Sequence, residues 1–195
     1  GDDDTASATS DSALGITFLD DGPSASAKTG VSESAQVDES ALGTSDTITA
    51  AEIAALFATP ISYGADSSGS TTYALSATNG AATGLFLTGT TTNEIDLVKV
   101  TNGYEGWTDG DTTSGTKAFT ISIDSATGAV TVTQHATLEH ATDGSTAAAH
   151  NDSLGLSSAA AVSVVQTVTD GDDDTASATS DSALGITFLD DGPSA

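Results

Sequence analysis

The sequence contains no cysteine, no methionine and no arginine, and it has only three lysines. Without cysteine, disulfides cannot stabilise the fold, so a secreted chain of this composition needs another source of stability, and bound metal ions would serve. The 28 acidic residues give a formal net charge of −25. Such a field repels nucleic acid and anionic lipid and attracts cations, which excludes nucleic acid as a partner and predicts no membrane contact by this domain. A simpler interpretation is that the charge only keeps an exposed protein soluble.

Aromatic residues and long apolar runs are scarce as well. The chain has nine aromatic residues in 195, and no apolar run is long enough to span a bilayer. Short segments that alternate between apolar and polar residues are separated by Gly, Asn, Thr and Asp. Many short strands with glycine-rich turns predict an all-β fold, an antiparallel Ig-like or cadherin-like β-sandwich.

One stretch of 25 residues occurs twice, at 1–25 and at 171–195, with every letter identical. The offset of 170 residues predicts one period of a tandem array plus the overlap into the next period. Each copy ends in Asp-Asp-Gly-Pro-Ser-Ala, and Gly-Pro after a strand-like run indicates a domain junction, because Pro favours extended backbone before it. The expected organisation is the terminal strand of a preceding repeat (1–21), a linker and domain start (22–36), the sandwich (37–191) and the next linker (192–195).

Local patterns predict the individual elements. Thr49-Ala50-Ala51-Glu52 matches a capping box, and the apolar spacing after it predicts one short helix at about 50–58. Residues 118–123 and 129–133 alternate with period two and form the clearest hairpin, joined by 124–128. Further strands are expected at 71–75, 84–87, 94–100, 159–169 and 175–189.

The two identical strand segments, 5–19 and 175–189, compete for one place in a single sandwich. We expect the C-terminal copy to fill this place, because it directly follows its hairpin partner. The N-terminal copy should then be loose, or pair with a neighbouring molecule through an exposed edge.

The acidic residues are expected to gather at one end of the domain. Tandem sandwiches join end to end, so the last strand must run from the N-terminal pole, where the incoming linker arrives, to the C-terminal pole. This places the turn at 170–174 beside the linker. The acids expected at that pole are Asp20, Asp21, Asp38, Glu39, Asp170, Asp172, Asp173 and Asp174, and Asp190 and Asp191 repeat the linker pair at the next junction.

Calcium is the cofactor that these acids predict. It accepts six to eight oxygen ligands in flexible geometry, whereas magnesium demands tighter octahedral order and zinc prefers His or Cys. Asp-Gly-Asp also forms good turns without any metal, which is the interpretation we favour for 109–111.

Several segments resemble the calcium-dependent extender repeats of the giant RTX adhesins that Gram-negative bacteria export by type I secretion. The segments are 37–44, 63–66, 69–75, 118–134, 168–176 and 188–194. The resemblance implies a calcium-rigidified sandwich in an extracellular stalk that holds an adhesive tip away from the cell surface, as in biofilm formation, with identical neighbouring repeats as partners. It also puts Asp20, Asp21 and the acids of 170–174 on calcium positions. Two departures are that Asp173 stands where the repeats usually have Gly, and that the unit is longer around 91–116.

Other chemistry has little support in the sequence. His135, His140 and His150 lack the tight pairing or Cys partners of a zinc site and are predicted to be surface or loop residues. Nothing resembles a nucleophile elbow, so we predict neither an enzyme nor a small-molecule substrate. Trp107 could stack on a sugar, which keeps a carbohydrate- or surface-binding module as the alternative, although a partly buried core anchor is the simpler interpretation.

Overall fold

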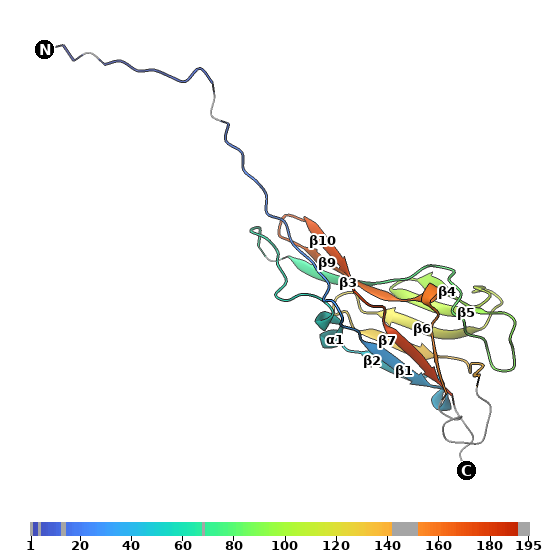
Figure 1. The fold of residues 1–195 in the computed structure, drawn as a ribbon. Coiled ribbons are helices and arrows are strands. Elements are labelled where there is room, and N and C mark those ends of the chain that lie inside the picture. The colour runs from blue at the N-terminus through green and yellow to red at the C-terminus, as the bar shows by residue number, and fades with distance from the viewer. Residues whose placement is uncertain (1, 4, 13–14, 68, 142–151, 191–195) are drawn as a thin grey trace.

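The computed structural model describes residues 2–3, 5–12, 15–67, 69–141 and 152–190. These residues form the predicted all-β sandwich with one short α-helix (Figure 1). The elements are β1 (Ser34–Asp38), η1 (Glu39–Ala41), β2 (Ser45–Ile48), α1 (Ala50–Ala55), β3 (Ser70–Ser76), β4 (Ile95–Val100), β5 (Gly103–Thr108), β6 (Lys117–Ile123), β7 (Val130–Gln134), β8 (Ser153–Gly155), η3 (Ser158–Ala160), β9 (Ser163–Thr169), β10 (Thr175–Thr179) and β11 (Gly185–Leu189). Within the described ranges, no helix combines the length and the apolar character needed to cross a bilayer.

The strands belong to three sheets. The largest has the order β2-β7-β6-β5-β4, and the two smaller sheets have the orders β1-β11-β8 and β10-β9-β3. β1 pairs with β11 in parallel, and the other strand pairs are antiparallel. Phe119 of β6 and Phe188 of β11, both fully buried, place their ring centroids 5.0 Å apart and so pack the large sheet against the β1-β11-β8 sheet.

The helix and the central hairpin form where local sequence predicts them. The Thr49 hydroxyl accepts a hydrogen bond from the Glu52 backbone N–H, and the Glu52 carboxylate accepts one from the Thr49 backbone N–H, which completes the capping box. Between β6 and β7, Asp124 Oδ1 accepts hydrogen bonds from the N–H groups of Ala126 and Thr127. Gly128 then supplies the left-handed φ of +85° that the turn requires.

Three expected strands differ from the structure. Residues 84–87 form no strand and contribute only an isolated bridge between Leu87 and Leu138. The strand expected at 159–169 begins only at Ser163, after η3. The single strand expected at 175–189 is two strands, β10 and β11, which belong to different sheets. Residues 180–184 connect β10 to β11 and so carry the chain from one sheet to the other.

The C-terminal copy of the duplicated segment fills the sandwich, as predicted. Ile186 and Phe188 are 2% and 0% exposed, whereas their repeat equivalents Ile16 and Phe18 are 72% and 92% exposed. In the N-terminal copy the described residues before Asp20 form no strand and extend away from the domain (Figure 1). The same sequence therefore has two environments in one chain, because only one copy has strands to pair with.

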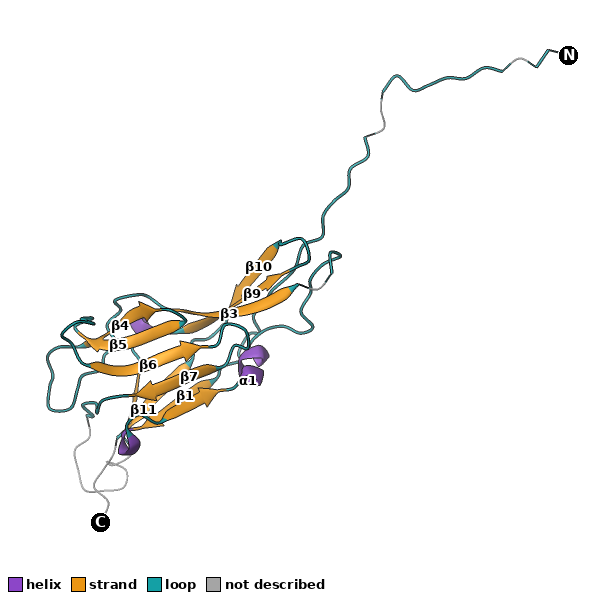
Figure 2. Cartoon of the chain, turned by 180° about the vertical axis from the view of Figure 1, so that it is seen from behind, coloured by secondary structure: helices purple, strands orange, loops and turns teal. Residues whose placement is uncertain are grey.

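The two ends of the domain are set by the directions of the last strands. The N-terminal segment reaches the domain beside the turn between β9 and β10, and β11 ends at the opposite pole (Figure 2). Residues 24–28 dock along the loop after α1, through bridges from Ser24 to Ser62 and from Ala27 to Phe57. The incoming linker is thus attached at the pole that also carries the acidic turn.

Candidate metal centre

Three backbone segments converge at the N-terminal pole: the linker at 20–22, the loop at 64–69 and the β9–β10 turn at 170–174. Three of the contacts are possible only at glycine, and one of them is that of Gly69, where a Cβ would lie 1.9 Å from the Thr169 carbonyl oxygen and 2.5 Å from the Asp170 carbonyl oxygen. A Cβ on Gly64 would lie 1.8 Å from the Asp21 carbonyl oxygen, and a Cβ on Gly171 would lie 2.0 Å from the Asp66 carbonyl oxygen. The Ala65 N–H also donates a 3.3 Å hydrogen bond to the Asp21 carbonyl. This close approach brings acids from three distant parts of the sequence together.

The β9–β10 turn is closed by its own acids. The Asp170 N–H donates to the Asp174 carbonyl at 3.1 Å, and the Asp174 N–H donates to Asp170 Oδ1 at 2.9 Å. Asp173 has a φ of +76°, a left-handed conformation that favours glycine. The turn therefore keeps the geometry of a glycine turn although Asp occupies the position.

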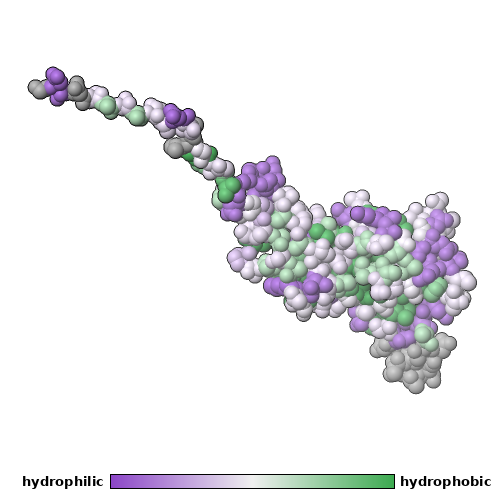
Figure 3. All heavy atoms as spheres, turned by 45° about the horizontal axis from the view of Figure 1, so that its top comes forward, coloured by the Kyte–Doolittle hydropathy of each residue, from purple (hydrophilic) through white to green (hydrophobic). Residues whose placement is uncertain are grey.

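Five carboxylates form one group at this pole, which we call the linker cluster: Asp20, Asp66, Asp170, Asp172 and Asp174. Ligand oxygens of Asp20, Asp66 and Asp172 all lie within 4.8 Å of one another, and so do those of Asp170, Asp172 and Asp174. Figure 3 shows hydrophilic residues gathered where the N-terminal segment meets the domain. Asp172 belongs to both sets, so it joins the linker to the turn.

The electrostatics of the linker cluster are those of like charges held together. A side-chain hydrogen bond with Asp170, desolvation and the charges of Asp170, Asp20 and Asp66 raise the pKa of Asp172 to about 6. The pKa of Asp174 is also raised, chiefly by a side-chain hydrogen bond with Asp20. Desolvation and the Asp20 charge raise the pKa of Asp66. Every charged group that perturbs these three residues is another carboxylate, so the cluster favours a bound proton or a bound cation.

Asp170 supplies an independent indication of a ligand. Asp170 is only 3% exposed, and its Oδ2 atom is buried without a hydrogen-bond donor among the described residues. A hydrogen bond between the side chains of Asp172 and Asp170 requires a proton on one of the two carboxyl groups, because an ionised carboxylate only accepts. With both groups ionised, the buried oxygen needs another partner, and a cation would provide it.

The donor set fits calcium. Calcium takes six to eight oxygen ligands, which the five carboxylates could supply together with main-chain carbonyls and water. Neither imidazole nor thiol belongs to the linker cluster, so the chemistry of its donors is that of a hard cation.

Four of the predicted acids, Asp20, Asp170, Asp172 and Asp174, lie in the linker cluster. The main-chain carbonyl of Asp21 accepts the hydrogen bond from the Ala65 N–H, and the charge of its side chain raises the pKa of Asp66. Asp173 belongs to the turn but not to either set of close oxygens. Asp66 is not among the acids predicted from the sequence, although Gly64, two residues earlier, was a signal that this loop approaches another backbone segment closely.

The prediction that Asp38 and Glu39 crowd the N-terminal pole is wrong. Because β1 runs parallel to β11, both strands end at the C-terminal pole, where Asp38 lies opposite Leu189. Asp38 caps η1 there by accepting a 2.9 Å hydrogen bond from the Ser40 N–H, and its hydrogen bonds with Ser40 lower its pKa. Glu39 lies near Asp190 at the same pole. Asp191 lies outside the described residues.

A family described as a domain of unknown function, DUF5801, matches residues 34–183. The chain belongs to this family. The match begins at the first residue of β1 and ends between β10 and β11, so it covers most of the DUF5801 sandwich, including the β9–β10 turn and the loop with Asp66, but not the linker residue Asp20. Neither a curated protein nor a solved structure matches the chain significantly.

Trp107, the candidate sugar-stacking residue, is half-buried on β5 of the DUF5801 domain. Its indole N–H donates to Glu105 Oε2 at 2.8 Å, and Lys117 Nζ lies 3.0 Å from Glu105 Oε1 and 5.7 Å from the centre of the indole ring. The lysine therefore already occupies the approach to one face of the ring.

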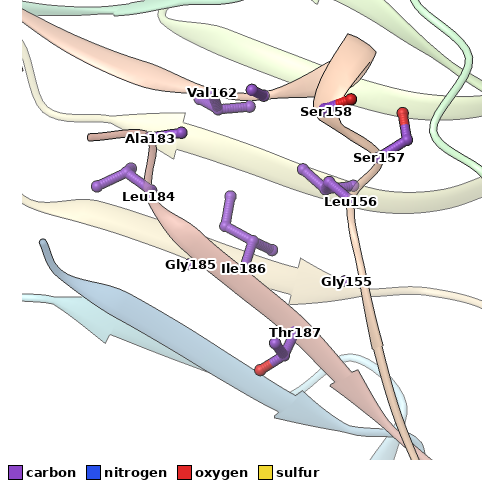
Figure 4. Close-up of a pocket in the computed structure, with 11 residues that line it drawn as sticks. Gly155, Leu156, Ser157, Ser158, Val162, Ala183, Leu184, Gly185, Ile186 and Thr187 are labelled. Carbon is purple, nitrogen blue, oxygen red and sulfur yellow. The ribbon is translucent and has the colours of Figure 1, made fainter. Parts of the chain in front are cut away.

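An apolar cavity of about 460 Å³ lies elsewhere, between η3 and β11 (Figure 4). Leu156, Val162, Leu184 and Ile186 line it, and no titratable residue does. It offers no charged or metal-binding group to a ligand.

Proposed function

We propose that this domain is an extender unit of a tandem array and that calcium bound at the linker cluster stiffens each junction. The observation that carries the proposal is that Asp20 of the linker shares one set of close oxygens with Asp66 and Asp172 of the domain. A cation coordinated by both parts would fix the angle at which the linker meets the domain. Without a cation, mutual repulsion of the same carboxylates would push the linker away.

The expected energy per junction is modest. Calcium sites in extracellular modules bind with Kd values of about 10⁻⁴ to 10⁻³ M. At about 10 mM calcium, a site at the weak end of this range is stabilised by about 1.4 kcal/mol. Such an energy is small beside the stability of a domain, but it acts at a hinge and repeats at every junction.

The arrangement of the ends favours a mechanical function. The linker arrives at one pole and the last strand ends at the other, so successive repeats would continue in line (Figure 1). In this proposal the partners are identical neighbouring repeats, the setting is the surface of a Gram-negative bacterium, and the domain itself catalyses no reaction.

The test compares Asp172→Asn with Asp2→Asn. Asp2 is the repeat equivalent of Asp172, with the same neighbours in sequence, but it lies in the extended N-terminal segment. Calcium titration calorimetry should give a Kd for the Asp2→Asn variant equal to that of the unaltered chain. The Asp172→Asn variant should bind about tenfold more weakly or worse, because it lacks the shared ligand. Equal calcium affinity in the two variants, or no binding by the unaltered chain at about 10 mM calcium, would refute the proposal.

A further inference from the structure

A second group of potential ligands lies at the C-terminal pole, away from the linker cluster. One ligand atom each of Glu39, His140 and Asp190 lies within 4.8 Å of the other two. We call these three residues the Glu39 group. They come from η1, from the segment after β7 and from the residue directly after β11, so only the folded chain brings them together.

Buried polar atoms around this group lack partners. Both ring nitrogens of His140 are inaccessible to solvent, and neither makes a hydrogen bond with any residue that the structure describes. An imidazole has at least one N–H and either a second N–H or a lone pair, so burial without any partner leaves its polar character unsatisfied.

Gln134 adds a third unpartnered atom and fixes the position of Glu39. Gln134 is 1% exposed, and its Nε2 donates to Glu39 Oε2 at 3.2 Å and to the Ala136 carbonyl at 3.1 Å. These two acceptors set the orientation of the amide and leave its Oε1 buried without a donor. The Leu138 N–H also donates to Glu39 Oε2, at 2.9 Å. The carboxylate is therefore held in place by the protein rather than by solvent.

The geometry points to a site for a first-row divalent transition-metal ion at the Glu39 group, with zinc as its probe. Zinc binds imidazole nitrogen and carboxylate oxygen, and sites with three protein ligands leave a fourth position for water or another oxygen. Two carboxylates balance the charge of the ion, and a nitrogen of His140 gains the partner that it lacks. The imidazole argues against calcium here, because calcium takes oxygen ligands.

This site would act on the other side of the same junction. Asp190 is the repeat equivalent of Asp20, because the two residues are 170 positions apart in identical segments. In an array, one linker aspartate would therefore belong to the Glu39 group of the domain that it leaves and to the linker cluster of the domain that it joins. A carboxylate has two oxygens and can contact two ions. The inference does not require that the linker cluster binds calcium.

The test titrates zinc into the full chain in the presence of about 10 mM calcium, which saturates the proposed calcium site. His140→Asn is compared with His135→Asn, since His135 is exposed and pairs with Thr120 on the surface of the large sheet. We expect zinc affinity to fall about tenfold or more in the His140 variant and to stay unchanged in the His135 variant. Unchanged zinc affinity in the His140 variant, or no zinc binding by the unaltered chain, would overturn the inference.

Two further measurements keep the outcome clear. In the unaltered chain, one equivalent of zinc should shift the side-chain nitrogen resonances of His140 but not those of His135, and a shift confined to His135 would contradict the site. This NMR measurement uses the unaltered chain and therefore does not depend on whether a variant folds. The Asp172→Asn variant should keep its zinc affinity whether or not it has lost calcium, so failure of the calcium proposal and failure of the zinc site give different results.

Discussion

Asp172 is the residue whose protonation depends most on the other carboxylates of the linker cluster. It is shared by both sets of close oxygens, and its neighbours raise its pKa to about 6 from an ordinary value of 3.8. A raised pKa in the folded state means that the protonated carboxyl group is favoured by folding. That contribution to stability is complete below the unfolded pKa of 3.8 and is lost as the pH rises through about 6.

The first prediction concerns this pH dependence. In the presence of a chelator, the melting temperature should fall between about pH 4 and pH 7, because the linker cluster loses its protons. Calcium should reduce the fall, since it replaces those protons. Residues whose pKa is lowered, such as Asp111 and Asp124, lose their stabilising effect only as the pH falls through still lower values. The Asp172→Asn variant should show a shallower fall than Asp2→Asn, and identical profiles would contradict the assignment.

Asp173 allows a second prediction at a single residue. The left-handed backbone at Asp173 costs energy for any residue with a Cβ, so replacing Asp with Gly removes this cost. Part of that gain is lost, because Gly has more conformational freedom in the unfolded chain. Asp173→Gly should therefore raise the free energy of unfolding in a chelator by up to about 1 kcal/mol. The control is Asp3→Gly, the equivalent change in the extended N-terminal segment, which should have no effect. A destabilised Asp173→Gly variant in urea unfolding would show that the Asp side chain is needed in the turn.

At the level of elements, the duplicated segment provides its own control for core packing. Phe188 lies against Phe119 in the core, whereas the identical residue Phe18 is 92% exposed. Phe188→Ala should lower the free energy of unfolding by about 3–5 kcal/mol. Phe18→Ala should change it by less than about 0.5 kcal/mol. Similar losses in urea unfolding would mean that the two copies exchange places in the sandwich.

Elements with local signals could be predicted from the sequence. The capping box fixes the start of α1, and the alternation on both sides of 124–128 fixes the β6–β7 hairpin and its buried residues. The break between β10 and β11 was not predicted, because the segments on both sides of it are strands. The choice of sheet for each half depends on partners that are far away in sequence.

The positions of the acids could also be predicted only where they do not depend on contacts between residues that are distant in sequence. The proximity of Asp172 to the linker followed from the direction of the last strand alone. The placement of Asp38 and Glu39 depended on β1, which carries the chain to the opposite pole by pairing in parallel with β11, about 150 residues later. Asp66 reaches the linker cluster through backbone contacts at Gly64 and Gly171, which no periodic pattern announces.

At the level of the whole molecule, we propose a chain of domains that are attached through charged joints. In the proposed array each domain would carry acids at both poles, and one linker aspartate would recur at each junction. With a net charge of −25 for this chain, bare junctions should repel, and successive domains should sample many angles. Divalent ions at the joints would replace that repulsion with coordination and restrict the angles.

Small-angle X-ray scattering from a chain of two or more successive repeats would show whether calcium fixes the joints between domains. We expect the maximum dimension to be larger at about 10 mM calcium than in a chelator, because domains held in line by a fixed joint extend further on average than domains at a free joint. Asp→Asn changes at the positions of Asp66 and Asp172 in every repeat should leave the chain equally compact in both conditions. If the scattering profiles of the unaltered chain were the same with and without calcium, calcium would not stiffen the joints.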